Sequence, residues 1–359
     1  LPIYGEGKYL YYSDFTNNPN TPDSSILGTD GKFKIRIQAT NPRDFAFFVK
    51  KGDYIRLIVS PGEKIELSAH ADSMQLSYKV TGSLYSEQVF ELYKHLNYNI
   101  DRVDSLSIIF RQYQNSNKLD SILPILRKKS DAIFRNERDF LLSFIENNPG
   151  SPASYVALSI QLHARAPIFK AYEDYEWFKK VDSALNISYP ASDISSFIHS
   201  FVMKVEDKIK VEKEKEKRVG IGAFAPEIAL PSPKGDTLRL SSLRGKYVLL
   251  DFWAAWCKPC RVENPNLVKA FLKYRWKGKG FDIFQVSLDK SKEDWLKAIR
   301  ADNLRWKHVS DLKFWGSAPV PIYGVQGIPA NFLLDPDGKI IAKNLRGEEL
   351  EKKLAEIFK

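Results

Sequence analysis

The feature that most constrains this chain is a Cys-x-x-Cys pair, Cys257 and Cys260, which are its only cysteines. They follow a short continuous apolar run at 248–250, which is typical of a strand buried on both faces. A loop of two intervening residues excludes a framework of structural disulfides. The five histidines are scattered and no further thiolate is available, which argues against a zinc site. The pair therefore predicts a redox-active dithiol where a buried strand enters a helix.

That position gives the two cysteines different tasks. Cys257 would lie at the helix N-terminus, where unpaired N–H groups and the helix dipole stabilise a thiolate. Lys258 adds a cation beside it, and Pro259 suits the first helical turn, where its missing N–H costs little. We expect the Cys257 thiolate to attack a substrate disulfide and Cys260 to resolve the mixed disulfide.

Proton transfer needs a base near the second cysteine. Asp251, near the end of the preceding strand, would be partly buried with a raised pKa and could accept the proton of Cys260. Glu263, three residues after Cys260, is a second candidate. A capping or surface carboxylate is the alternative interpretation of Asp251, and a solvated helix residue that of Glu263. Trp256 is expected to shield the disulfide and to report its redox state.

The pattern from residue 219 to 359 is that of an α/β domain. A second strand is predicted at 281–288 and a helix at 292–302. A hairpin follows at 331–341 around an Asp-Pro-Asp-Gly turn, and a helix closes the chain at 348–358.

Residues 1–85 predict a small antiparallel β-sandwich. Phe33, Ile35 and Ile37 alternate with charged residues, which is typical of a strand with one buried face. A second alternation at 55–59 is followed by a Ser-Pro-Gly-Glu turn. No catalytic constellation occurs in this region, and its function is unknown.

Residues 86–218 predict an α-helical region that ends in a charged linker. Apolar residues recur at helical spacing at 89–110 and again at 133–145. Ser151 and Pro152 are typical of a helix N-cap followed by Pro at the first helical position. Packing of these stripes against each other is the simpler interpretation, but they also allow a homo-oligomer. Lysine and glutamate alternate at 204–218, and Gly220 and Gly222 mark the domain boundary. The fold class is thus multidomain: β-sandwich, helical region and α/β domain.

Charge and hydropathy restrict the partners. The net charge is +10, of which +8 falls on residues 219–359. Basic residues are not interleaved with aromatic ones, so nucleic acid is not an expected partner. Acidic partners or anionic membrane surfaces remain alternatives to a simply solvated surface. No run of eighteen apolar residues predicts a membrane span. The chain starts at Leu1 without Met, which suggests a mature or trimmed sequence in which any signal peptide or lipid-bearing cysteine would be missing from view.

At this point the sequence resembles the thioredoxin-like family. The segment Asp251–Cys260 looks like the family's Asp-Phe-Trp strand end and Trp-Cys-x-x-Cys motif. Gly324–Pro329 looks like its cis-proline element, which implies a cis Pro329 facing the disulfide and an Ile328 whose backbone pairs with an incoming peptide. The segments 223–226 and 240–246 resemble the opening of the membrane-associated extracytoplasmic TlpA/ResA type.

The resemblance implies a thiol–disulfide oxidoreductase that reduces protein disulfides in the periplasm or cell envelope of a bacterium. It implies re-reduction by a membrane or envelope thiol donor, and no metal or organic cofactor. Glu263 matches a functional glutamate of ResA-type proteins, whereas Asp251 matches the buried aspartate of thioredoxin. Residues 27–33 and 81–83 resemble, more weakly, the front part of bacterial redox lipoproteins, which implies lipid anchoring at the N-terminus.

Three alternatives remain open. A peroxiredoxin shares the fold but needs Thr or Ser three residues before its cysteine, where this chain has Ala254. A disulfide oxidase or isomerase uses the same pair, because the reduction potential decides the direction. In the last alternative the chain is a binding or scaffold protein with an accessory redox domain.

Overall fold

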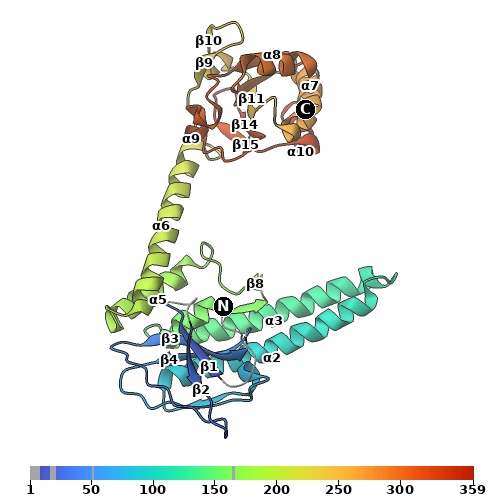
Figure 1. Cartoon of the computed structure of the whole chain (residues 1–359). Helices are drawn as coiled ribbons and strands as arrows, with labels where there is room; N and C mark the ends of the chain where they lie inside the picture. The colour runs from blue at the N-terminus through green and yellow to red at the C-terminus, as the bar shows by residue number, and fades with distance from the viewer. Residues whose placement is uncertain (1–8, 17–21, 51, 164–165) are drawn as a thin grey trace. The chain divides into compact units, whose positions relative to one another are not determined.

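The computed structural model describes residues 9–16, 22–50, 52–163 and 166–359. The chain divides into two compact units, Leu1–Lys208 and Ile209–Lys359 (Figure 1). The sequence suggested three regions, but the first two share a core: Ile58 of the β region is fully buried among helical residues such as Leu92 and Leu141. The division at 208/209 lies ten residues before the predicted linker end at 218.

An antiparallel sheet forms the front of the first unit, as predicted. Its order is β2-β1-β3-β4, and a separate ladder joins β5 to β6. The strands are β1 (Tyr9–Asp14), β2 (Asp23–Ile26), β3 (Arg43–Lys50), β4 (Asp53–Val59), β5 (Glu66–Ser68) and β6 (Lys79–Thr81). Phe45, Phe47 and Leu57 fill the core of this part.

The expected strand at 33–37 differs from the structure. Phe33, Ile35 and Ile37 are half-buried against the core, as their alternation predicted, but the segment forms no ladder with any described residue. Alternating burial requires only contact with a core, whereas a strand also needs a partner for its backbone groups. The β5–β6 ladder and this extended segment pack against the same core as the four-stranded sheet, and a complete two-layer sandwich stays a prediction.

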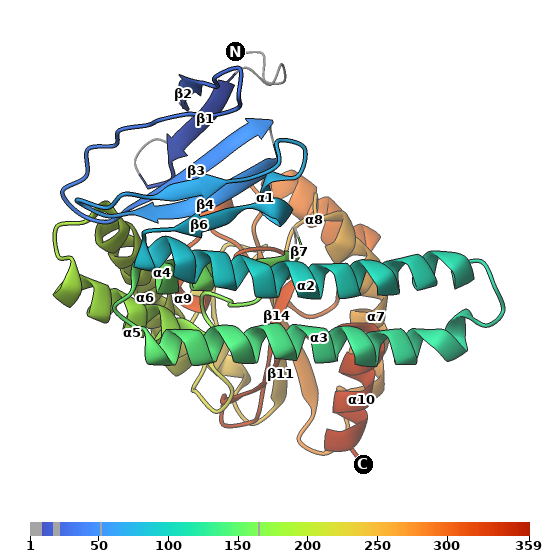
Figure 2. The same ribbon diagram turned by 90° about the horizontal axis from the view of Figure 1, so that it is seen from below.

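The predicted helices are present. The helices of the first unit are α1 (Met74–Ser77), α2 (Leu84–Tyr113), α3 (Leu119–Asn147), α4 (Pro152–Ser159), α5 (Tyr175–Ser188) and α6 (Asp193–Val219), with α6 continuing into the second unit. A short ladder, β7 (Gln161–His163) with β8 (Ala166–Pro167), follows α4. The long helices α2 and α3 lie side by side (Figure 2). Ser151 caps α4 by accepting the N–H of Ala153, and Pro152 follows it, as the sequence indicated.

The second unit is built on one mixed sheet in the order β13-β12-β11-β14-β15. Its strands are β11 (Tyr247–Trp253), β12 (Phe281–Ser287), β13 (Lys307–Val309), β14 (Ala330–Leu334) and β15 (Ile340–Lys343), preceded by the ladder of β9 (Ala229–Pro231) and β10 (Thr237–Arg239). The helices are α7 (Lys258–Tyr274), α8 (Lys292–Ala301), α9 (Pro319–Tyr323) and α10 (Gly347–Ile357). Strands β11, β12 and β13 are parallel, while β14 and β15 run antiparallel.

The central strand β11 explains where the site lies. Residues Val248 to Trp253 are all buried, since β11 has a neighbour on each side and belongs to the core of the unit. Its apolar sequence is what such a strand requires. The chain leaves its carboxyl end, turns once and enters α7. Among the described residues, no helix combines the length and the apolar character needed to cross a membrane.

Candidate active site

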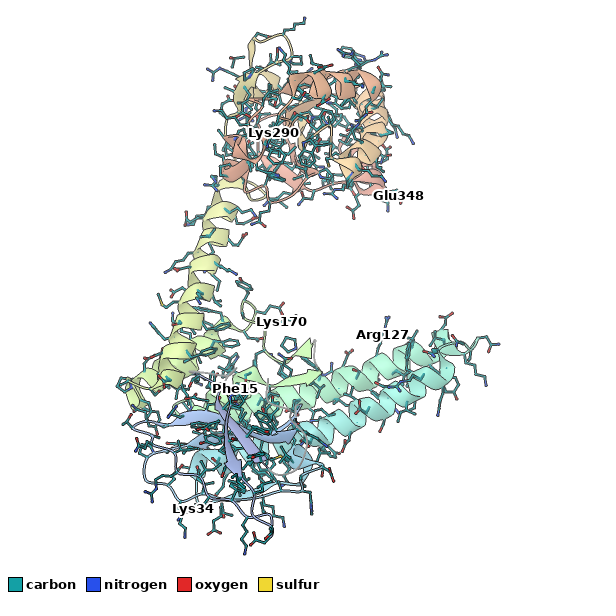
Figure 3. The ribbon with its side chains drawn as sticks, in the orientation of Figure 1. Phe15, Lys34, Arg127, Lys170, Lys290 and Glu348 are labelled. Carbon is teal, nitrogen blue, oxygen red and sulfur yellow. A yellow bond between two sulfur atoms is a disulfide. The ribbon has the colours of Figure 1, made fainter. Side chains whose placement is uncertain are left out.

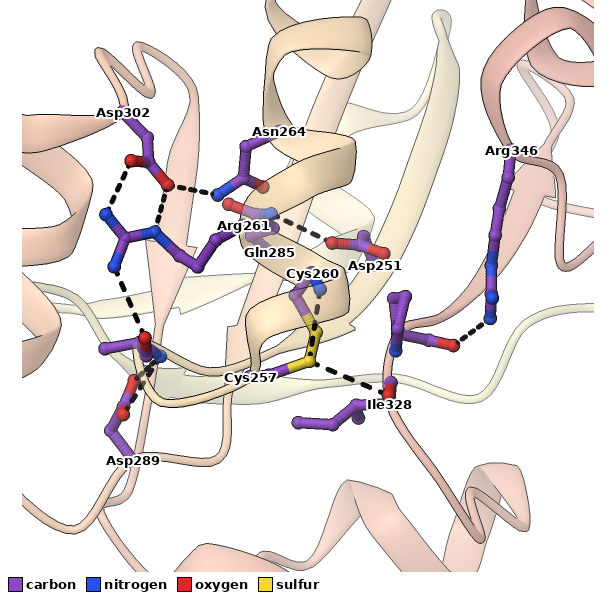
Figure 4. The surroundings of a disulfide bond; sticks show 12 residues. Asp251, Cys257, Cys260, Arg261, Asn264, Gln285, Asp289, Asp302, Ile328 and Arg346 are labelled. Carbon is purple, nitrogen blue, oxygen red and sulfur yellow. Dashed lines mark hydrogen bonds and ion pairs between the residues drawn. A yellow bond between two sulfur atoms is a disulfide. The ribbon is translucent and has the colours of Figure 1, made fainter.

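The cysteine pair lies at the junction between β11 and α7, as predicted. Cys257 is the N-cap of α7, and its Sγ accepts the backbone N–H of Cys260 at 3.2 Å. The two cysteines are joined in a disulfide and both are buried (Figure 4). Lys258 and Pro259 occupy the first turn and are exposed. A thiolate formed at Cys257 is therefore held by a helix N-terminus.

Trp256 forms an exposed apolar surface beside the disulfide. Its side chain is 51% exposed, and its ring centroid lies 5.3 Å from that of Phe314. The ammonium of Lys290, which Figure 3 labels, lies 4.6 Å from the centroid of the same Phe314 ring. A hollow of about 700 Å³ adjoins these side chains and continues along α8 to Lys297. The edge of the site thus combines aromatic surface with charged groups of both signs, because Asp289 and Asp294 line the same hollow as Lys290.

The proline element faces the disulfide from the other side. The Ile328–Pro329 peptide bond is cis, as the resemblance implied. The carbonyl oxygen of Ile328 lies 3.7 Å from Sγ of Cys257. Arg346 donates from Nη2 to the carbonyl oxygen of Pro329 and so ties this loop to the start of α10 (Figure 4). A groove of about 790 Å³ runs along residues 323–330.

Asp251 lies on β11 and is 3% exposed. Burial raises the pKa of Asp251 to about 7; the negative charge of Glu263 acts in the same direction, and the hydrogen bond from Gln285 and the charge of Arg346 oppose it. Gln285 Nε2 donates to Oδ2 of Asp251 at 2.9 Å. A carboxyl group with this pKa exchanges protons near neutral pH, which suits a general base.

Glu263 is half-buried and already has partners. Its Oε1 accepts the backbone N–H of Gly347 at 2.8 Å, and its Oε2 accepts from Nδ2 of Asn266 at 3.1 Å. Within the described residues it makes no hydrogen bond to Cys260. Glu263 therefore links α7 to the start of α10, and its part in proton transfer stays a prediction.

Two further side chains, which sequence reasoning missed, hold the turn before Cys257. The carboxylate of Asp289 accepts the N–H of Ala255 with both oxygens at 3.1 Å. Arg261 donates from Nη1 to the carbonyl oxygen of Ala255 at 3.3 Å and pairs with Asp302. Ala255 is thereby held at both ends of its backbone (Figure 4). The position of Asp289 just after β12 was a usable signal, because parallel strands end at the same edge of a sheet.

Comparisons with known proteins agree with this site. A family model described as the AhpC/TSA family matches residues 221–343, and one described as a domain of unknown function matches residues 3–89. The thiol-disulfide oxidoreductase ResA of Bacillus thuringiensis subsp. konkukian is 32% identical over 145 residues, which are 40% of this chain and 80% of the relative. That of Geobacillus kaustophilus is 33% identical over 142 residues, covering 39% and 79%. The crystal structure of a thioredoxin domain of a thiol-disulfide oxidoreductase from Bacteroides vulgatus shares 40% identity, covers 39% of this chain and 98% of its own, and has a TM-score of 0.37.

The length of the match to the curated relatives decides the family. Four fifths of the ResA relative is covered at 32% identity. Residues 221–343, which the AhpC/TSA family model matches, include the β11–α7 junction and the proline element. The geometry adds a disulfide at the N-terminus of α7 facing a cis proline. The chain therefore belongs to the ResA-like thiol-disulfide oxidoreductases, with a thioredoxin-like catalytic unit at its C-terminal end.

Proposed function

We propose that this oxidoreductase reduces protein disulfides outside the cytoplasm, with Cys257 as the nucleophile and Cys260 as the resolving thiol. The observation that carries the proposal is the place of Cys257: its sulfur lies at the N-terminus of α7 and beside the carbonyl oxygen of Ile328. The helix terminus favours the thiolate, and the Ile328–Pro329 segment offers a backbone edge for a peptide.

The reaction balances in two displacement steps. In the reduced enzyme, the Cys257 thiolate attacks one sulfur of the substrate disulfide, whose other sulfur leaves as a thiolate. Cys260 then transfers its proton to Asp251, and its thiolate attacks the Cys257 sulfur of the mixed disulfide. The second substrate sulfur leaves, and the enzyme disulfide forms. Two electrons pass from the enzyme pair to the substrate, so neither a metal nor an organic cofactor is required.

The surroundings of the disulfide suit an extended polypeptide substrate. Gln326 and Gly327 are exposed and lead into Ile328, and the two hollows lie at Trp256 and along this loop. Backbone pairing with Ile328 would give affinity without demanding one sequence, while Trp256, Lys258 and Pro259 would contact the residues around the scissile disulfide. Proteins with accessible disulfides are therefore the proposed substrate class.

Re-reduction and location complete the proposal. A membrane or envelope thiol donor would return two electrons to the pair, and the chain would act in the periplasm or cell envelope, held by an N-terminal lipid. The support is the resemblance to extracytoplasmic thioredoxins, since residues 1–8, next to any such anchor, lie outside the described residues. A membrane-impermeant maleimide added to intact cells tests it: labelling of the reduced pair is expected, and protection until lysis would contradict it.

The helical region is the proposed surface for a second copy of the chain. Four large apolar side chains on α2 and α3 are more than half exposed, namely Leu84, Tyr98, Ile108 and Ile125. Sedimentation of the full chain over a range of concentrations tests the oligomer, and a concentration-independent monomer would remove it.

The chemistry itself is tested by reduction of insulin with the full chain and a chemical thiol donor. Cys257→Ser should lose turnover and form no mixed disulfide, because the remaining thiol lies one turn inside α7 and is 2% exposed. A variant of the exposed turn residue Ser242, Ser242→Ala, should keep full turnover. Full insulin reduction by Cys257→Ser would sink the mechanism.

A further inference from the structure

A buried amide connects Asp251 to an indole that lies just before β13. Gln285 on β12 lies opposite Asp251 in the parallel ladder and is fully buried. Its Nε2 donates to Asp251 Oδ2 at 2.9 Å, and its Oε1 accepts the Nε1–H of Trp306 at 2.9 Å. Trp306 is 8% exposed and immediately precedes β13. The three side chains form a continuous chain of hydrogen bonds in the core.

These hydrogen-bond partners allow only one orientation of the Gln285 amide. An indole N–H can only donate, and an ionised carboxylate can only accept. Gln285 must therefore turn its oxygen to Trp306 and its NH₂ group to Asp251. The amide of a glutamine with one free end could rotate by half a turn, but here both ends are committed. Trp306 makes no hydrogen bond to the disulfide. By fixing the orientation of the Gln285 amide, it ensures that Asp251 accepts a hydrogen bond from an N–H group.

This orientation distinguishes the two oxygens of Asp251. Oδ2 faces the NH₂ group of Gln285 whether Asp251 is ionised or protonated. A proton on Oδ2 would therefore point at another hydrogen-bond donor, which is unfavourable. No described residue donates a hydrogen bond to Oδ1. Oδ1 is accordingly the oxygen that remains available for a proton.

We propose that Gln285 and Trp306 are positioning residues, which hold Asp251 with Oδ2 occupied and Oδ1 free as the proton acceptor for Cys260. The inference rests on the proposed function of Asp251 as the base of the resolving step. In that step the S–H bond of Cys260 breaks, its proton goes to Oδ1, and its electron pair stays on sulfur and forms the bond to Cys257. Neither residue touches the reacting sulfur atoms in this account.

Other charged, titratable or polar groups surround the hydrogen-bonded residues Asp251, Gln285 and Trp306. Glu263 on α7 raises the pKa of Asp251, and Arg346 at the start of α10 lowers it. His308 on β13 stacks on Trp306, with ring centroids 5.9 Å apart. Burial lowers the pKa of His308 to about 4, so it stays neutral while Asp251 titrates. Asn331 on β14, opposite Asp251, bonds the backbone of Leu345 with both ends of its amide.

Removal of the indole N–H should change the titration of Asp251. In Trp306→Phe the amide is free to turn its oxygen toward Asp251, where it accepts the O–H of the protonated acid and favours that form. The acid limb, the pH range in which the rate of the resolving step falls as Asp251 becomes protonated, should then move up by about one pH unit. The reason is that the free energy of a hydrogen bond to a charged group is at least that of a one-unit pKa shift. The rate at pH 6 should fall about five- to tenfold. Gln285→Met, which keeps the length of the side chain, should shift the limb in the same direction.

The chain offers a matched control for packing. Trp295 is also buried, at 1% exposed, but its Nε1–H has no hydrogen-bond partner among the described residues. Trp295→Phe therefore removes an indole without removing a hydrogen bond and should leave the acid limb in place. A purely structural role for Trp306 would make the two variants alike.

The experiment records two quantities on the full chain and its variants. Stopped-flow Trp fluorescence follows the resolving step from pH 5 to 9, and difference infrared spectroscopy follows the carboxyl band that Asp251→Asn abolishes. The expected result is a higher midpoint of both in Trp306→Phe and no shift in Trp295→Phe. An unchanged infrared midpoint in Trp306→Phe overturns the positioning role. If Asp251→Asn leaves the acid limb unchanged, the proposed base fails instead, and the infrared midpoint still decides the orientation of the amide.

Discussion

The sulfur of Cys257 lies 3.7 Å from the carbonyl oxygen of Ile328, although the two residues are 71 positions apart in the chain. The contact joins the helix that activates the thiol to the loop that precedes β14. Arg346 fixes the far side of that loop through the carbonyl oxygen of Pro329. A peptide bound along Ile328 would therefore reach the attacking sulfur without a rearrangement of either element.

The first prediction concerns the order of the two thiols. Cys260→Ser should keep the first attack but lose resolution, because the nucleophile at the helix N-terminus remains and its partner does not. Incubation with a disulfide-containing peptide should add the mass of one peptide half, released by dithiothreitol. Cys257→Ser should not form this adduct. An adduct on Cys260 in that variant would reverse the assigned order.

The second prediction concerns stability against pH. Burial holds the pKa of Asp251 at about 7 against an ordinary value of 3.8, so between these values the folded state binds more protons than the unfolded state. Stability from this group therefore falls as pH rises from about 4 to about 7. Asp251→Asn removes the effect and should gain stability relative to the parent on going from pH 5 to pH 8, by up to about 3 kcal/mol.

Urea unfolding of the oxidised protein at the two pH values measures this gain. Asp337→Asn, in an exposed turn, should show none. His308 acts in the opposite direction: its pKa of about 4 lies below the ordinary 6.5, so its contribution is lost as pH falls between them. The double difference between parent and Asp251→Asn cancels that contribution, and an equal difference at both pH values would contradict the buried, protonated carboxyl.

The third prediction concerns the turn before Cys257. Asp289→Leu should leave the N–H of the half-buried Ala255 and the O–H of the fully buried Ser287 without their acceptor. The expected loss of stability is about 2 kcal/mol or more, since each unpaired buried group costs about 1–3 kcal/mol. Calorimetry of the full chain is the measurement, with Asp337→Leu as the control. A transition unchanged by Asp289→Leu would show that Ala255 is not held in this way.

The fourth prediction concerns the first unit. Asp44 is fully buried and binds Arg56 through both oxygens, and the guanidinium also donates to Ser159. Asp44→Ala leaves a buried unpaired cation and should destabilise this unit by about 3–5 kcal/mol. Asp30→Ala removes an exposed pair with Lys32 and should leave the transition where it is. Equal effects in calorimetry would mean that the Asp44 pair is not desolvated.

Local signals carried most of what the sequence predicted. The run at 248–250, the cysteine spacing and the Ile-Pro dipeptide are each contained in a few residues, and the structure places all three as expected. Ser151 and Pro152 likewise predicted the start of α4, because Ser is a preferred N-cap residue and Pro is favoured at the first helical position. These features depend on neighbours in the chain, which a sequence displays directly.

The remaining features depend on partners far apart in the chain. Arg346 meets Pro329 and Trp306 meets Gln285 only after the sheet has formed, so no spacing announces them. The amide of Gln285, placed between the apolar residues Phe284 and Val286 of β12, was an available hint. The prediction of a strand at 33–37 was wrong for a related reason. An alternating pattern identifies a buried face, but it does not identify a partner strand.

The most direct test of the central claim is the equilibrium reduction potential of the Cys257–Cys260 pair, read from Trp fluorescence in thiol redox buffers. A reductant of protein disulfides requires a potential near or below about −250 mV, in the range of thioredoxin, and we expect the Cys257–Cys260 pair to have a potential in this range. A potential near about −120 mV would make the protein an oxidant and would contradict the proposed direction of electron flow.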